Sequence, residues 1–317
     1  MHIANTLKNI ISRLLQTILI LVGVTLITFF ILHISPGNPA ETWLRGVGGH
    51  AGTVSEEAIR EQEQKMALDK PFLVQYGIWL GNVVQGDMGY SLISKKPVLE
   101  ELKAKALPTI QLTFVSLFIT VLLSIPLGIY CAVYKDSWFD NIIRVFSFIG
   151  ISMPSFLSSL ILLWFFCLKL GWFPVIAADG ITGMILPVTV FVFQCASKLT
   201  RQIRSVVLEQ LNKGYMKGAV ARGVGRRAIL FSHVLKNCLI PILSWCGIYT
   251  GIMLGGAAVI ENVFSWNGMG KLAVEAVVAL DYYLIQGFVL WVALIFLFVN
   301  FFIDILSALI DPRIKTS

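Results

Sequence analysis

Long apolar runs, separated by short polar segments, dominate the pattern of hydrophobic and polar positions along the chain. An α-helix needs about 20 mostly apolar residues to cross a hydrocarbon core of about 30 Å, and its backbone polar groups must be hydrogen-bonded within the helix. Six nearly uncharged runs approach or exceed this length, at residues 14–34, 106–134, 145–168, 180–200, 237–260 and 282–303. The pattern predicts an all-α integral membrane protein with six transmembrane helices.

The polar segments between these runs set the expected topology. Residues 35–105 form a long loop with eight basic and nine acidic residues, and a near-neutral loop of this length can lie outside the cytoplasm. Basic residues next to spans stay on the cytoplasmic side. Fifteen basic residues lie at the N-terminus (1–13), in the turn between the second and third spans, at the end of the fourth span, in the loop at 201–236 and in the tail (304–317), so we expect these segments to be cytoplasmic.

The longest polar interruption in the second half of the chain covers residues 212–241. Six of its residues are basic and none is acidic. Small residues at Gly218, Ala219 and Ala221 predict a short helix with a thin face, and Gly223 is placed to end that helix as a C-cap. A short basic helix between two spans is typical of a docking element for a cytoplasmic partner. A solvated basic loop of any multispan protein is the alternative interpretation.

Several short stretches carry a family resemblance. Lys217, Gly218 and Ala219, followed by Gly223, are similar to the Glu-Ala-Ala-x-x-x-Gly pattern of ABC-importer coupling loops, in which only the last Ala and the Gly match. The stretches LDKP, VQYGIWL, GDMGYS, KPV and SMPSF follow in the expected order, and ENVFSWNGMG has Asn267 where the pattern E-x-V-F-x-W-P-G-x-G has Pro. Over essentially the whole chain, these stretches resemble the B-type permease subunits of peptide/nickel ABC importers.

This resemblance implies a type I ABC importer permease in a prokaryotic inner membrane, with both termini cytoplasmic. It implies pairing with a C-type permease, two ATP-binding subunits and an extracytoplasmic solute-binding protein. ATP and Mg²⁺ would be bound by the partner subunits, so we expect neither a cofactor nor an enzymatic activity on this chain. The loop at 212–236 would couple the chain to the ATPases through Tyr215, Lys217, Gly218, Ala219, Gly223, His233, Lys236 and Asn237.

Prolines and glycines within or near the spans mark candidate kinks or gates. A proline inside a span is accommodated when neighbouring groups satisfy the freed carbonyls. The G-x-x-x-G spacing of Gly251 and Gly255 favours close helix contact. A packing kink without a role in transport explains the prolines equally well. The candidates for a gate or kink are Pro126, Pro154, Gly255, Gly256 and Glu261.

Composition narrows the classes of function. Hydrophobic residues make up 56% of the chain and charged residues 14%, which does not describe a soluble domain. The net charge of +7 is concentrated beside apolar runs, so we expect a lipid membrane and no nucleic acid as a partner. The five cysteines lack metal-ligand spacing and are expected to be buried free thiols. The spans carry almost no ionisable groups, which argues against an ion-coupled secondary transporter, and a channel would not need the basic docking loop.

The substrate is the least constrained part of this interpretation. The resemblance allows nickel, metal chelates, dipeptides or oligopeptides. The stretch NPAETWLRG at 38–46 resembles nickel-type members slightly more than peptide-type members, which favours nickel or a metal chelate, with a dipeptide or oligopeptide as the alternative. His33 and His50 are weak candidates for metal contact, because ordinary interfacial histidines are more common.

Overall fold

The computed structural model describes residues 2–35, 37–46, 55–92, 94–178, 180–225 and 228–310, and only the backbone at 2–14, 217, 219–220 and 231–233. The described chain is helical and contains no strand, only an isolated antiparallel bridge between Tyr90 and Pro97. It divides into two compact units, each described by itself below. The first combines Met1–Leu107 with Lys271–Leu297, and the second combines Pro108–Gly270 with Phe298–Ser317.

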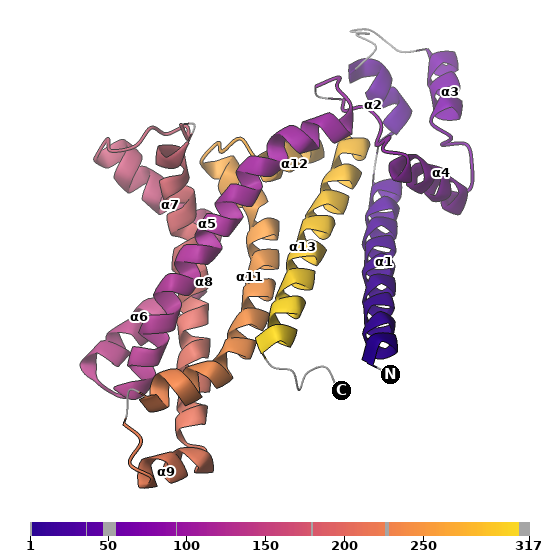
Figure 1. Cartoon of the computed structure of the whole chain (residues 1–317). Coiled ribbons are helices and arrows are strands. Elements are labelled where there is room, and N and C mark those ends of the chain that lie inside the picture. The colour runs from indigo at the N-terminus through magenta and orange to yellow at the C-terminus, as the bar shows by residue number, and fades with distance from the viewer. Residues whose placement is uncertain are drawn as a thin grey trace. The chain divides into compact units, whose positions relative to one another are not determined.

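Five helices are long and apolar enough to cross a membrane (Figure 1). They are α1 (His2–Ile34), α5 (Val98–Val133), α8 (Ile181–Leu211), α11 (Leu235–Val263) and α13 (Tyr282–Ile310). A sixth span is formed if α6 (Trp138–Ser152) is counted with the helical segment Ser155–Lys169, which is bent from it by 106°. The predicted all-α membrane architecture is thereby confirmed.

The residues around these spans also form helices. Three short helices lie in the region expected as a long loop, at α2 (Pro39–Gly46), α3 (Glu56–Lys65) and α4 (Phe72–Val84). Helix α5 begins at Val98 instead of near residue 106. Glu100 and Glu101 occupy its first turn, where negative charge stabilises a helix N-terminus.

In the first unit, an aromatic cluster joins α1 to α4. Phe29 of α1 lies 5.6 Å from the ring of Tyr76 and 6.1 Å from that of Trp79, measured between ring centroids. The hydroxyls of Thr25 and Tyr76 are 2.9 Å apart and share a hydrogen bond. The Phe29–Tyr76 pair is edge-to-face, an arrangement that stabilises packing beyond the area it buries, so α4 is held against α1.

A buried carboxylate fixes the start of α13 in the same unit. Asp281 is fully buried and accepts hydrogen bonds from the Ser91 hydroxyl at 2.8 Å and from the backbone N–H of Leu92 at 2.6 Å. It also accepts from the N–H of Leu284 at 3.2 Å, as an N-cap does. The loop before α5 and the start of α13 are therefore held by one side chain.

Helix α8 is central to the second unit, where it packs against α6 and α11. The approach to α6 is close because α6 carries Gly150, where an added Cβ would collide with the Ser197 side chain of α8. The core of this unit is apolar and includes Phe191, Leu199 and Ile203 of α8. All five cysteines, Cys131, Cys167, Cys195, Cys238 and Cys246, are free and buried, as expected from their positions in apolar runs.

Candidate functional site

The coupling segment, defined here as residues 212–236, contains a short helix between α8 and α11. This helix, α9 (Gly214–Ala221), lies beyond the end of α8 in Figure 1. Met216 anchors it with a side chain only 4% exposed, whereas Tyr215 is 40% exposed. A Cβ added at Gly214 or Gly218 would meet no atom within 4 Å. The helix therefore has one anchored side and a smooth open side.

Hydrogen bonds close the base of the coupling segment. The Tyr215 hydroxyl donates to Oε1 of Gln210 on α8 at 2.8 Å, and Nδ2 of Asn237 on α11 donates to the Tyr215 hydroxyl at 3.1 Å. Lys213 forms an ion pair with Glu209 at 3.2 Å. The structure thus brings together Tyr215 and Asn237, two of the predicted coupling residues, and connects α9 to both neighbouring long helices.

Gly223 follows α9 with a φ of +79°, the left-handed conformation that favours glycine. The last turn before it is closed by the N–H of Arg222, which donates to the carbonyl of Gly218 at 3.2 Å. This is the helix end that the sequence predicts for the glycine. Lys236 is exposed, while the side chains of Lys217, Ala219 and His233 lie outside the described part of the chain.

Pro154 stands at the break between α6 and α7 (Ser155–Leu162), where the chain bends by 106°. The carbonyl of Met153 at this bend accepts a hydrogen bond from Nε2 of Gln194 on α8 at 2.9 Å. Beyond α7, residues Leu163–Lys169 form a π-helical segment, a form often found at functional sites. Pro126, in contrast, lies inside the continuous helix α5. Of these two candidate prolines, only Pro154 therefore marks a sharp bend.

The glycines of α11 differ in their surroundings. A Cβ at Gly255 would meet nothing within 4 Å, and one at Gly256 would touch the ring of Phe191 at 3.4 Å. Among the described residues, the expected close helix contact is therefore not made at Gly255. It is made instead at Gly247, where an added Cβ would collide with Oδ1 of Asn300 on α13.

Glu261 lies at the centre of a buried hydrogen-bond network at the end of α11. Its carboxylate accepts from the Thr109 hydroxyl at 2.6 Å and from the N–H of Gly270 at 2.7 Å. The N–H of Met269 donates to the same Thr109 hydroxyl at 2.8 Å. An added Cβ at Gly268 would collide with the Glu261 carboxylate. The stretch ENVFSWNGMG is thus folded around its own glutamate, which holds the first turn of α12 (Met269–Val278).

The first unit has its own cavity, of about 240 Å³, beside one of the two histidines that were considered for metal contact. His33 is one of its lining residues and packs against the ring of Phe72, with 5.3 Å between ring centroids. Within the described ranges, no group of three or more His, Cys, Asp or Glu side chains is arranged to hold a metal ion. His50 lies outside these ranges.

At the rim of this cavity Lys65 pairs with Glu61, one turn earlier on α3. The Lys65 ammonium lies 2.7 Å from Oε1 of Glu61. Its hydrogen bond lowers the pKa of the Glu61 carboxyl below the ordinary value, so this exposed carboxyl stays ionised. The pair is on the surface of a short polar helix and gives the rim no net charge.

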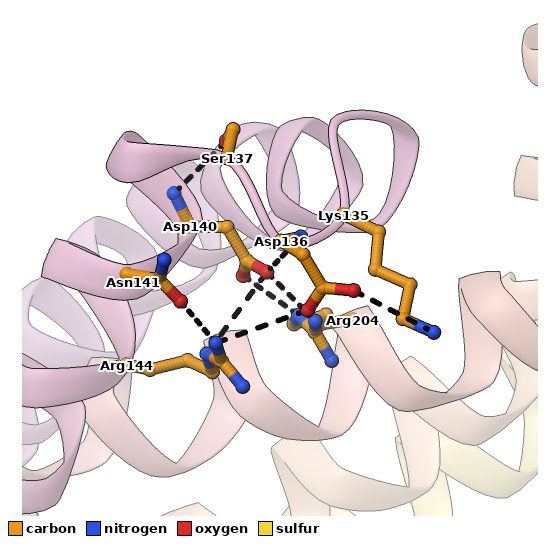
Figure 2. Close-up of polar contacts among 7 residues, drawn as sticks. All are labelled: Lys135, Asp136, Ser137, Asp140, Asn141, Arg144 and Arg204. Atoms are coloured by element: carbon orange, nitrogen blue, oxygen red, sulfur yellow. Dashed lines mark hydrogen bonds and ion pairs between the residues drawn. The ribbon is translucent and has the colours of Figure 1, made fainter.

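A buried ion pair in the second unit was not predicted from the sequence. Asp140 of α6 is fully buried, and Nε and Nη2 of Arg204 on α8 donate to its two carboxylate oxygens at 2.8 and 2.7 Å (Figure 2). The N–H of Asp136 donates to the same carboxylate at 2.9 Å. The available signal was the charge of Arg204 at the end of an apolar run, but its partner is 64 positions away.

The chain was compared with known families, curated proteins and solved structures. Residues 124–316, more than half of the chain, match the model described as "Binding-protein-dependent transport system inner membrane component", and residues 6–113 match the corresponding N-terminal model. The dipeptide transport system permease protein DppB of Alkalihalophilus pseudofirmus is 36% identical over 96% of this chain and 98% of its own length.

Two further similarities complete the comparison. The glutathione transport system permease protein GsiC is 36% identical in Salmonella choleraesuis and 34% in Escherichia coli K12, over 98% of this chain and 99% of GsiC in both cases. The inward-facing MetNI methionine ABC transporter has a similar fold, with a TM-score of 0.55 at 15% sequence identity. That match covers 66% of this chain and 96% of the MetNI chain.

Proposed function

Because the chain belongs to the family of binding-protein-dependent transport system inner membrane components and is a permease subunit of an ABC importer, we propose that it forms half of a translocation pathway for short peptides. Relatives that align over nearly the whole chain are named as dipeptide and glutathione permeases. The names of these relatives favour the peptide alternative over nickel or a metal chelate, for which the support is the stretch at 38–46.

The observation that carries the mechanism is the attachment of α9 to two long helices. Tyr215 is hydrogen-bonded to Gln210 of α8 and to Asn237 of α11. A force applied to the open side of α9 would therefore act on both helices together. We assign the coupling segment to contact with an ATP-binding subunit, whose closure on ATP would switch the pathway between inward-facing and outward-facing states.

The family implies a partner permease, ATP-binding subunits and a binding protein in an inner membrane. We assign the partner permease to the C-type, the number of ATPases to two, and both termini of this chain to the cytoplasm. The basic residues beside the spans support this orientation. The ATPases supply the energy. The role of this chain is to transmit the movement of α9 to its membrane-spanning helices.

Uptake assays separate the two substrate classes. Cells that lack the gene, and the same cells complemented with it, are compared for uptake of a radiolabelled dipeptide and of radiolabelled nickel. Loss and recovery of dipeptide uptake alone is the expected result. Loss of nickel uptake alone would overturn the peptide assignment and would direct attention to His33 and His50. An unchanged uptake of both would exclude these two substrates while the membership of the family stands.

A further inference from the structure

Two neighbouring cavities in the second unit differ in character and share part of their walls. The polar cavity, of about 200 Å³, is named for its four charged lining residues, Asp140, Arg144, Arg201 and Arg204, and is also lined by the apolar side chains of Cys131, Ile143 and Phe148. The apolar groove, of about 390 Å³, is lined mainly by aliphatic and aromatic side chains of α5, α6 and α8. Ile143, Ser147 and Thr200 line both. The polar cavity, also called the basic recess below, is therefore adjacent to the apolar groove.

The basic recess keeps positive charge after its internal ion pairs are counted. Asp140 is engaged by Arg204 through two short hydrogen bonds. Arg144 is 48% exposed and donates a hydrogen bond from Nη2 to Oδ1 of Asn141 (Figure 2). Its contacts with carboxylates are long, 3.9 Å to Asp136 and 4.0 Å to Asp140, so its other N–H groups are not taken up by a short ion pair. Arg201 is exposed and forms no ion pair with any described residue. Arg144 and Arg201 are thus available to an external anion.

Exposed aromatic side chains place the recess at the level of a membrane surface. Tyr130, Tyr134 and Trp138 are each between 46% and 75% exposed and lie on α5, α6 and the turn that joins them. Tyr130 and Tyr134 pack together with 4.6 Å between ring centroids. Tyr and Trp are enriched where lipid headgroups meet the hydrocarbon core. The polar cavity therefore lies at headgroup depth.

The apolar groove has the length expected for an acyl chain. It follows α8 from Thr200, which it shares with the recess, to Val188. The twelve steps from Thr200 to Val188, at a rise of about 1.5 Å per residue, extend about 18 Å, close to half of a hydrocarbon core of about 30 Å. The groove is open at its side, where Leu123 and Phe146 are exposed.

We propose that this site binds one anionic phospholipid, with its phosphate on Arg144 and Arg201 and an acyl chain in the groove. Guanidinium groups bind phosphate oxygens through paired hydrogen bonds. Basic pockets between transmembrane helices on the cytoplasmic side bind anionic lipid headgroups. The groove favours a lipid over a free phosphate, because inorganic phosphate would leave it unfilled. The proposal does not depend on which substrate is transported.

Native mass spectrometry of the intact transporter complex tests the site. The complex is titrated with phosphatidylglycerol, with phosphatidylcholine of the same acyl chains, and with inorganic phosphate as a competitor. The double variant Arg144→Gln/Arg201→Gln should bind phosphatidylglycerol about thirty-fold more weakly. This value corresponds to about 1 kcal/mol for each basic residue, at about 1.4 kcal/mol per tenfold change. Lys198→Gln, on α8 but outside both cavities, is the matched control and should bind as the unmodified complex does.

A second pair of variants tests the groove. Leu123→Trp fills it, and Leu122→Trp adds the same ring to an exposed position that does not line it. Only Leu123→Trp should weaken retention of phosphatidylglycerol. Equal retention of the two lipids, or an unchanged affinity in the arginine variant, would overturn the proposal. Full competition by inorganic phosphate would show an anion site without a lipid. Separation of the two permease subunits by Leu123→Trp would show that the groove is a subunit interface.

Discussion

Arg204 and Asp140 face each other across α8 and α6 with two parallel hydrogen bonds of 2.8 and 2.7 Å, one from Nε and one from Nη2 (Figure 2). Asp140 is completely buried, and the Arg204 side chain is 16% exposed. A buried charge that loses its partner is strongly destabilising, because it has lost its hydration and no opposite charge compensates for that loss. The pair therefore makes the packing of α6 on α8 depend on both residues at once.

The first prediction concerns this pair. Asp140→Ala should lower the stability of the folded protein by about 3 kcal/mol or more, because Arg204 is left without its acceptor. The measurement is the thermal unfolding midpoint of the purified complex. Asp136→Asn is the control, because Asp136 is 64% exposed and Asn tolerates its positive φ of 62°. Equal shifts in the two variants would contradict the assigned role, and so would a double variant Asp140→Leu/Arg204→Met that is no more stable than Asp140→Ala.

The second prediction concerns Gly223. Gly223→Val should abolish uptake and uncouple ATP hydrolysis from transport, because a β-branched residue at a φ of +79° is strained by about 1–3 kcal/mol and would displace the end of α9. Uptake and ATPase activity are measured in membrane vesicles, with the amount of inserted protein as a reference. Gly225→Val is the control, since a Cβ there meets nothing within 4 Å and its φ is not positive. Normal uptake in Gly223→Val would argue against the coupling role.

The third prediction concerns the turn between α11 and α12. An added Cβ at Gly270 would lie 2.5 Å from the backbone N of Ala258 and 2.7 Å from the carbonyl carbon of Ala257. Gly270→Ala should therefore destabilise the protein by about 1–3 kcal/mol, as overpacking against rigid backbone does. Gly255→Ala adds the same methyl group to an open position of α11. A lower unfolding midpoint for Gly270→Ala alone is expected, and equal midpoints would show that the turn relaxes freely.

The fourth prediction concerns His33. Its ring packs on Phe72, so His33→Phe should preserve both the fold and the uptake of peptide. His33→Ala should lower the stability modestly and leave the affinity for substrate unchanged. The assay compares the concentration dependence of uptake with the amount of protein in the membrane. If both variants lose uptake while the protein is present at the normal level, the imidazole itself takes part in transport.

Hydropathy was sufficient to locate the membrane-spanning helices, but it did not give the short helices α2, α3 and α4 or the angles between helices. The run at 145–168 was expected as one span, and Pro154 was recognised within it. The bend of 106° follows from how the chain packs, including the bond from Gln194 to the Met153 carbonyl, which no local pattern encodes. The position of Gly223 at a helix end could be predicted from the sequence, because a positive φ favours glycine.

Long-range polar contacts could not be predicted from the sequence, for a different reason. The stretch from Glu261 to Gly270 was noticed as a motif. Its conformation depends on the Glu261 carboxylate, which accepts hydrogen bonds from Thr109, 152 positions away, and from the first turn of α12. The spacing of Gly251 and Gly255 suggested a helix contact, but which glycine faces a neighbour depends on helix rotation. In the structure that glycine is Gly247.

The burial of every native cysteine gives the chain a practical property. All five thiols are shielded, so a water-soluble maleimide should leave the folded protein largely unlabelled. A single cysteine introduced at Gly218, on the open side of α9, would then be the reactive one. Its rate of modification would report directly when a partner covers this helix, during turnover and without removal of any natural residue in the core.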